Sequence, residues 1–278
     1  MTVLLFSLIV LAGSFLAGLV GSLTGLGGGV VIIPLLTLGF GVDIHYAIGA
    51  SLISVIATSS GAAAAYVKEG ISNIRIGMFL EIATTLGAVG GATLAIYAPT
   101  HIIAVIFGFV LIFSAALSLK KKEEVLVQAK AGKFATALKL DSSYPTAKGE
   151  IKYSAQNIPG GFFMMAIAGL ISGLLGIGSG ALKVIAMDHF MRLPFKVSTT
   201  TSNFMIGVTA AASAGIYMQR GYINPGLSMP VVLGVIGGAF LGSKILVKSE
   251  TKWLRILFAI IIVFLAFQMI YNGITGQI

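Results

Sequence analysis

The sequence contains no cysteine and few charged residues. Without cysteine the chain has no disulfide framework, no thiolate metal site and no cysteine nucleophile. Only 10% of its 278 residues are Asp, Glu, Lys or Arg and 57% are hydrophobic, whereas about a quarter of the residues of a soluble domain are charged. With a mean hydropathy of +1.01, this composition excludes a soluble globular domain and predicts an integral membrane protein.

The motifs of common enzymes are missing as well. HExxH, Walker A and nucleophile-elbow patterns do not occur, and the three histidines are dispersed without metal-ligand spacing. The triplets Gly25-Leu26-Gly27 and Gly176-Ile177-Gly178 are weak echoes of dinucleotide motifs, but they lack the context of a strand and an acidic partner for a ribose. We therefore expect no enzyme, no catalytic residue, no metal, no cofactor and no ATP-driven mechanism.

The net charge is +9, and the positions of the basic residues indicate whether this charge serves nucleic-acid binding or membrane topology. Most basic residues outside the polar stretch 120–157 flank apolar runs, as the positive-inside rule describes, and they form no nucleic-acid groove. We therefore expect a basic cytoplasmic linker and no nucleic-acid partner. The lysines of this stretch are Lys120, Lys121, Lys122, Lys130, Lys133, Lys139, Lys148 and Lys152.

Apolar runs lie on both sides of the linker. The first, 3–23, is long enough to cross a bilayer and has neither a basic n-region nor a cleavage pattern, so it predicts a retained helix. The pattern predicts an all-α polytopic membrane protein with about 8–10 membrane segments: a first transmembrane repeat over 1–119, the linker over 120–157 and a second repeat over 158–278. Within the linker, Asp141 to Pro145 predicts a turn. The expected segments are 3–23, 30–40, 45–67, 75–97, 101–119, 158–175, a short segment ending at 190, 195–218, 227–246 and 253–271.

The second group of apolar runs repeats the first. Adding 151 to a residue number gives its counterpart without a gap from Gly18 to Ala88, and the matches include Tyr, Asn and Met, which chance among Gly and Ala does not explain. An odd number of crossings in each half makes the repeats inverted, whereas four crossings make them parallel. The positive-inside rule favours inverted repeats. Examples are Gly18 and Gly169, Ser51 and Ser202, Tyr66 and Tyr217, Asn73 and Asn224, and Met78 and Met229.

Two glycine clusters, 25–29 and 176–180, occupy matching positions in the halves. A helix can be interrupted inside a membrane where its unpaired backbone groups line a cavity, and two interrupted helices at matching positions indicate the substrate site of a transporter. Free N–H groups there attract anions. Isolated glycines such as Gly87 and Gly238 instead predict close helix packing.

Polar side chains near these clusters complete a candidate anion site. Lys183 follows the second cluster within an apolar run, so it is either a counter-ion on a pathway or a side chain that snorkels to the interface. Hydroxyl and amide groups at 51 and 201–203 offer donors to an oxyanion, whereas helix capping explains Ser198 or Thr199. The predicted substrate-binding residues are Gly27, Gly28, Ser51, Gly178, Ser179, Lys183, Thr201, Ser202 and Asn203.

Two carboxylates are candidates for proton coupling, Glu81 and Asp188. The alternative for Glu81 is an interfacial carboxylate paired with a neighbouring basic residue. The alternative for Asp188 is a solvated loop near Arg192.

Several motifs recur at family-specific positions: Gly25-Leu26-Gly27-Gly28-Gly29 with Pro34, Ala50-Ser51, Lys68-Glu69-Gly70-Ile71, Gly176-Ile177-Gly178-Ser179-Gly180, Thr201-Ser202-Asn203 and Arg220-Gly221-Tyr222-Ile223. In these motifs the sequence resembles the TauE/SafE family of sulfite exporters and organosulfonate permeases, over nearly the whole chain except the linker. The resemblance implies a carrier in the bacterial inner (plasma) membrane for small sulfur oxyanions or sulfonates. Ser179 departs from the family pattern by replacing a glycine, and Ile185 by replacing a proline.

The sequence therefore predicts a secondary transporter of sulfite or organosulfonates such as sulfoacetate, working by alternating access in contact with the lipid bilayer, with the proton as a candidate coupling ion. An anion channel and a membrane-embedded sensor or accessory subunit are the alternatives. The sequence leaves the oligomeric state open.

Overall fold

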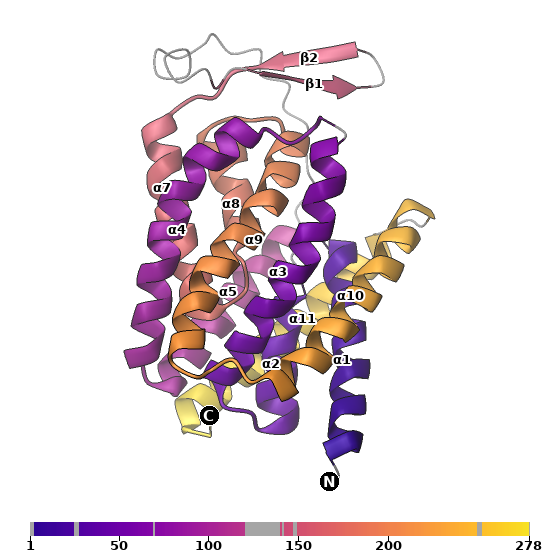
Figure 1. The fold of residues 1–278 in the computed structure, drawn as a ribbon, viewed down its shortest axis with the longest axis vertical. Helices are drawn as coiled ribbons and strands as arrows, with labels where there is room; N and C mark the ends of the chain where they lie inside the picture. The colour runs from indigo at the N-terminus through magenta and orange to yellow at the C-terminus, as the bar shows by residue number, and fades with distance from the viewer. Residues whose placement is uncertain are drawn as a thin grey trace.

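The computed structural model describes residues 3–24, 28–68, 70–119, 140, 142–146, 149–248 and 252–277. It is a bundle of long helices with a small hairpin at one end (Figure 1), which confirms the predicted all-α polytopic class. The first half holds α1 (Val3–Thr24), α2 (Gly29–Phe40), α3 (Ile44–Lys68), α4 (Ile74–Tyr97) and α5 (Thr100–Leu119). The second half holds α7 (Ile158–Leu175), α8 (Gly180–Ile185), the π-helical turn η1 (Ala186–Phe190), α9 (Phe195–Gln219), α10 (Pro225–Lys248) and α11 (Lys252–Thr275).

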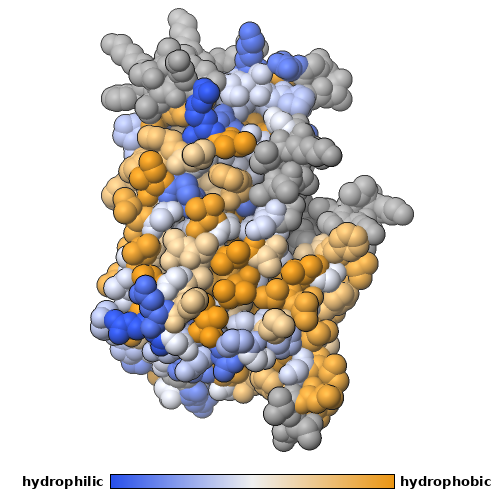
Figure 2. Space-filling view, viewed as in Figure 1, coloured by the Kyte–Doolittle hydropathy of each residue, from blue (hydrophilic) through white to orange (hydrophobic). Residues whose placement is uncertain are grey.

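The long helices have the dimensions of membrane spans. α7 has 18 residues and α3 has 25, which at 1.5 Å per residue gives about 27 to 38 Å. Counting only residues that the structure describes, α4 and α7 are long and apolar enough to cross a membrane. Large apolar side chains such as Leu86, Phe109 and Phe163 are exposed, and Figure 2 shows hydrophobic residues spread over the flank of the bundle. This surface suits lipid contact.

Local sequence sets where the helices begin and end. Asn73 caps α4, because its side chain accepts a hydrogen bond from the Ile76 nitrogen at 3.0 Å. Pro159 lies in the first turn of α7, where its missing N–H is harmless. Gly41 ends α2 in the left-handed conformation. The helix bounds therefore follow the hydrophobic runs of the sequence within a few residues.

The linker contains a strand pair that the sequence did not predict. β1 (Ser142–Thr146) pairs antiparallel with β2 (Gly149–Tyr153), so the turn predicted over Asp141 to Pro145 was wrong for residues 142–145; Asp141 lies outside the described residues. Pro145 is tolerated because both strands of a two-stranded sheet are edges and need not donate on their outer side. The hairpin lies at the end of the bundle opposite both termini (Figure 1).

The two halves correspond element by element. When 151 is added to the residue numbers of the first half, each helix overlaps one element of the second half. α1 overlaps α7, α2 overlaps α8 together with η1, α3 overlaps α9, α4 overlaps α10 and α5 overlaps α11. The contacts correspond too, because α1 packs on α10 and α4 packs on α7. At these contacts a Cβ at Gly87 would collide with the carbonyl of Ala166, and one at Gly238 with the carbonyl of Phe15. The predicted close packing at these two glycines is confirmed.

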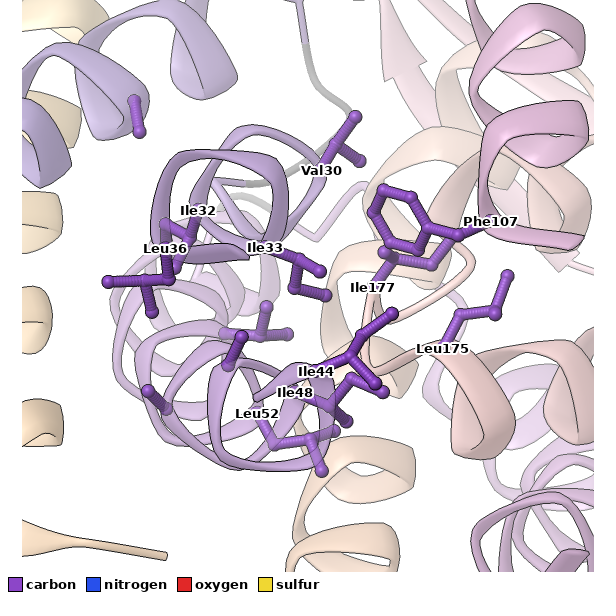
Figure 3. Packing of buried hydrophobic residues seen from close by; sticks show 14 of the residues in the cluster. Val30, Ile32, Ile33, Leu36, Ile44, Ile48, Leu52, Phe107, Leu175 and Ile177 are labelled. Carbon is purple, nitrogen blue, oxygen red and sulfur yellow. The ribbon is translucent and has the colours of Figure 1, made fainter. Parts of the chain in front are cut away.

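Equivalent helices α3 and α9 cross the centre of the bundle in opposite directions. Gly49, near the start of α3, lies against Tyr222, just after the end of α9. Gly207 of α9 lies against Ser59, farther along α3. This antiparallel pair forms the central contact between the halves. Figure 3 shows the apolar core beside it, where Ile33 of α2 and Phe107 of α5 lie near Ile177.

Candidate functional site

The second glycine cluster forms a sharp break between α7 and α8. Gly176 and Gly178 have φ angles of 66° and 73°, in the left-handed region that glycine enters without a Cβ penalty. Ser179 also lies there, at 43°, which is uncommon for a residue with a side chain. Its buried Oγ has no hydrogen-bond partner in the described part of the chain. The break therefore carries backbone strain and an unsatisfied hydroxyl at one place.

Hydroxyls of the two equivalent serines bind the carbonyl groups of this break. Ser51 Oγ of α3 donates to the Gly176 carbonyl at 2.8 Å, and Ser202 Oγ of α9 donates to the Gly180 carbonyl at 3.2 Å. Both serines are buried. Ser51 thus supplies a donor to a carbonyl just past the end of α7, and Ser202 supplies a donor to the carbonyl of the first residue of α8.

The first glycine cluster meets the second at Ser51. Gly28 forms the turn before α2, and its carbonyl accepts from the nitrogens of Val31 and Ile32. A Cβ placed on Gly29 would lie 2.5 Å from Ser51 Oγ and 3.3 Å from the Gly176 carbonyl oxygen. The structure therefore brings both breaks together against α3. Gly25, Leu26 and Gly27, which include one predicted site residue, lie outside the described residues.

Lys183 is the charged group nearest in sequence to the second break, and it is fully buried, so it does not snorkel to the surface. Its Nζ donates to Thr209 Oγ1 of α9. Thr209 Oγ1 lies 2.6 Å from Glu81 Oε1 of α4, and Thr85 Oγ1 donates to the same oxygen at 3.1 Å. Glu81 is 7% exposed. The hydroxyl of Thr209 thus bridges a lysine and a glutamate in the interior.

Thr209 and Thr85 were missed by the sequence prediction. Thr209 follows Ser202 by two helical turns and therefore lies on the same side of α9. That spacing is the signal that finds it, once Ser202 is accepted as a site residue. Thr85 follows Glu81 by one turn on α4, where a hydroxyl reaches back to the preceding carboxylate.

Other predicted site residues lie elsewhere. Thr201 accepts a hydrogen bond from the Asn73 nitrogen at 3.0 Å and so ties α9 to the start of α4. Asp188 lies on η1 with its Oδ2 3.5 Å from Nδ1 of His189. Asn203 is half-buried on α9, beside Ser202 in sequence. The structure places Ser51, Gly178, Ser179 and Ser202 at the second break, with Gly28 next in the chain to the glycine that meets Ser51. It links Lys183 to Glu81 through the hydroxyl of Thr209.

A cavity of about 420 Å³ opens at the end of the bundle opposite the hairpin. It is mostly apolar and includes Tyr46, five residues before Ser51 on α3. The cavity therefore lies at the start of α3, the helix that carries Ser51. Its lining residues are Phe6, Ser7, Val42, Tyr46, Asn224, Gly226 and Leu227.

Comparison with known proteins places these features in a family. The model of the family "Sulfite exporter TauE/SafE" matches residues 10–269. The probable membrane transporter protein YunE of Bacillus subtilis is 31% identical over 277 residues, covering 97% of this chain and 98% of the relative. The probable membrane transporter protein MJ0441 of Methanocaldococcus jannaschii is 26% identical and covers 93% of each chain. No solved structure matches.

Proposed function

Because the chain belongs to the TauE/SafE sulfite exporter family and is a membrane transporter, we propose that it is a secondary transporter of a small anion of the sulfite or organosulfonate class. The observation that carries this proposal is the fully buried Lys183, three residues after a glycine break that contains an unsatisfied Ser179 hydroxyl. A buried cation beside free donors suits an oxyanion. No ATP-driven or catalytic step is needed.

In this proposal the two halves are inverted repeats, 1–119 and 158–278, joined by the linker 120–157. The antiparallel course of α3 and α9 and the exchanged contacts α1–α10 and α4–α7 support this symmetry. Arg75 stands near the start of α4 and Lys152 in the hairpin, and the Asn73 amide of the α3–α4 loop donates to the Tyr153 hydroxyl at 2.9 Å. By the positive-inside rule, this end faces the cytoplasm of a cell whose inner or plasma membrane holds the protein.

The anion binds where the breaks meet. Ser179 Oγ and backbone N–H groups at Gly28 and Gly178 supply donors, and Ser51 and Ser202 exchange a carbonyl acceptor for an oxyanion oxygen by rotating about χ1. Asn203 and Thr201 lie on the same helix as Ser202. Lys183 supplies a positive charge that compensates one negative charge of the anion. Rocking of one half against the other about α3 and α9 then gives alternating access.

A binding panel tests the substrate class. Purified protein is titrated with sulfite, sulfate, sulfoacetate and taurine, and binding is read as a shift in thermal unfolding temperature. We expect sulfite or sulfoacetate to stabilise the protein and zwitterionic taurine to do so least, because its ammonium group opposes Lys183. Equal or absent shifts for all four solutes would contradict the proposed substrate class.

A further inference from the structure

Lys183, Thr209 and Glu81 form a polar chain that joins three helices, and we call it the relay. The ammonium of Lys183 donates to the Thr209 hydroxyl, and that hydroxyl is 2.6 Å from Glu81 Oε1. The second carboxylate oxygen, Oε2, is buried and has no hydrogen-bond partner among the described residues. A carboxylate oxygen left in this state is unfavourable in a membrane interior, and a proton is the smallest ligand that relieves it.

The surroundings of Glu81 offer few other charges. α7, which packs on α4, has no charged residue. On α9 the charged residue is Lys196, exposed in the first turn, and on α4 itself Arg75 is exposed six residues before Glu81. The charged or titratable groups of α3 are His45 and Tyr46 in its first turn and Tyr66 and Lys68 in its last. Across the described residues, Lys183 is thus the cation linked to Glu81 through one hydroxyl.

The relay occurs once, although the fold repeats. With the offset of 151 residues, Thr209 corresponds to Thr58, but Lys183 corresponds to Ile32 and Glu81 to Val232. The hydroxyl is therefore duplicated and the two charges are not. Each molecule therefore has, among the described residues, one buried carboxylate, Glu81, paired with one buried cation, Lys183.

Resting on the proposed function, we propose that Glu81 takes up a proton together with the anion, because protonation of Glu81 frees the charge of Lys183 for the anion. In the empty site the Glu81 carboxylate balances the Lys183 ammonium. In the loaded site the neutral Glu81 acid carries the proton, and the anion balances Lys183. Both states have zero net charge, so both can exist in the membrane interior.

States with only one of the two ligands are unfavourable. A proton without an anion leaves Lys183 uncompensated, and an anion without a proton leaves one excess negative charge beside Glu81. Each of these states places a net charge in a buried site. The relay therefore couples one proton to one monovalent anion, in the same direction. Thr209 is a positioning residue that holds Lys183 and Glu81 in register.

The first test measures ethanesulfonate binding between pH 5 and pH 8, where the charge of this probe is fixed. For the wild type we expect affinity to fall as the pH rises, by up to tenfold per pH unit, because binding takes up one proton. Glu81→Gln, which mimics the protonated acid, is expected to bind independently of pH, with affinity at pH 8 at least tenfold above that of the wild type. Glu150→Gln, in the exposed hairpin, is the matched control and should keep the wild-type slope.

A second test uses the unaltered protein, so it does not depend on the folding of a variant. An inward ethanesulfonate gradient across proteoliposomes should acidify the lumen, with one proton entering per anion. Ethanesulfonate uptake without acidification would overturn proton coupling but not the proposed anion transport. The same conclusion would follow if Glu81→Gln kept the wild-type dependence of affinity on pH, or if Asp188→Asn lost that dependence instead. Absence of binding to the wild type and to Glu81→Gln would overturn the proposed function itself.

Discussion

Ser51 Oγ, in the first half of the chain, donates a 2.8 Å hydrogen bond to the carbonyl of Gly176, in the glycine break of the second half. The two residues are 125 positions apart and both are buried. This bond joins a central helix of one half to the interrupted helix of the other. It also places a hydroxyl next to the junction of the two breaks, where Gly29 approaches Ser51 most closely.

Replacing Ser51 by Ala should destabilise the protein by about 1–3 kcal/mol, because the Gly176 carbonyl loses a buried donor. Anion affinity should fall as well. Ser54→Ala is the matched control, since Ser54 Oγ donates within its own helix to the Ser51 carbonyl at 2.7 Å. Titration of both variants with sulfite measures the difference. Equal affinities in Ser51→Ala and Ser54→Ala would remove Ser51 from the site.

The relay predicts strong coupling between Lys183 and Glu81. Lys183→Met or Glu81→Gln alone should destabilise the protein by about 3–5 kcal/mol in the absence of anion, because each leaves a buried charge or carboxylate without its partner. The double variant should recover most of that loss. Unfolding of all four proteins in mixed micelles completes a double-mutant cycle. Additive losses would show that the two residues do not act as a pair.

The close helix contacts predict opposite effects for two glycine-to-alanine changes. Gly238→Ala should destabilise the protein by about 1–3 kcal/mol, because its Cβ meets the Phe15 carbonyl of α1. Gly90→Ala, on the exposed side of α4 with nothing within 4 Å, should instead stabilise by about 0.5–1 kcal/mol through helix propensity. Thermal unfolding of both variants compares them. A neutral Gly238→Ala would contradict the packing of α1 on α10.

The helices could be predicted from the sequence because hydrophobic runs and glycine clusters are local signals. The run 158–175 coincides with α7, and the break at Gly176 to Gly180 separates two helices as expected. The relay could not be predicted, since Glu81 and Thr209 are 128 residues apart and meet through the packing of α4 on α9. The hairpin was missed because Ser142, Ser143 and Pro145 are turn-forming residue types, whereas pairing with β2 makes them part of a strand.

Inverted repeats predict that equivalent residues lie on opposite sides of the membrane. Arg75 and Gly226 are equivalent with the offset of 151 residues, and both are exposed near helix starts. Since the native chain has no cysteine, Arg75→Cys and Gly226→Cys each give one labelling site. A membrane-impermeant maleimide added to intact cells should label position 226 and not position 75. Labelling of both from the same side would indicate parallel repeats.

The most direct test of the central claim is counterflow in proteoliposomes that contain only this protein. Vesicles loaded with unlabelled sulfite or sulfoacetate are diluted into a trace of the labelled anion. The account predicts transient, saturable accumulation of label that is lost in Lys183→Met and retained in the hairpin variant Glu150→Gln. Label entry that does not saturate and shows no counterflow would indicate a channel. No entry at all would indicate a sensor or accessory subunit. Either result would contradict a carrier that binds its anion between the two glycine breaks.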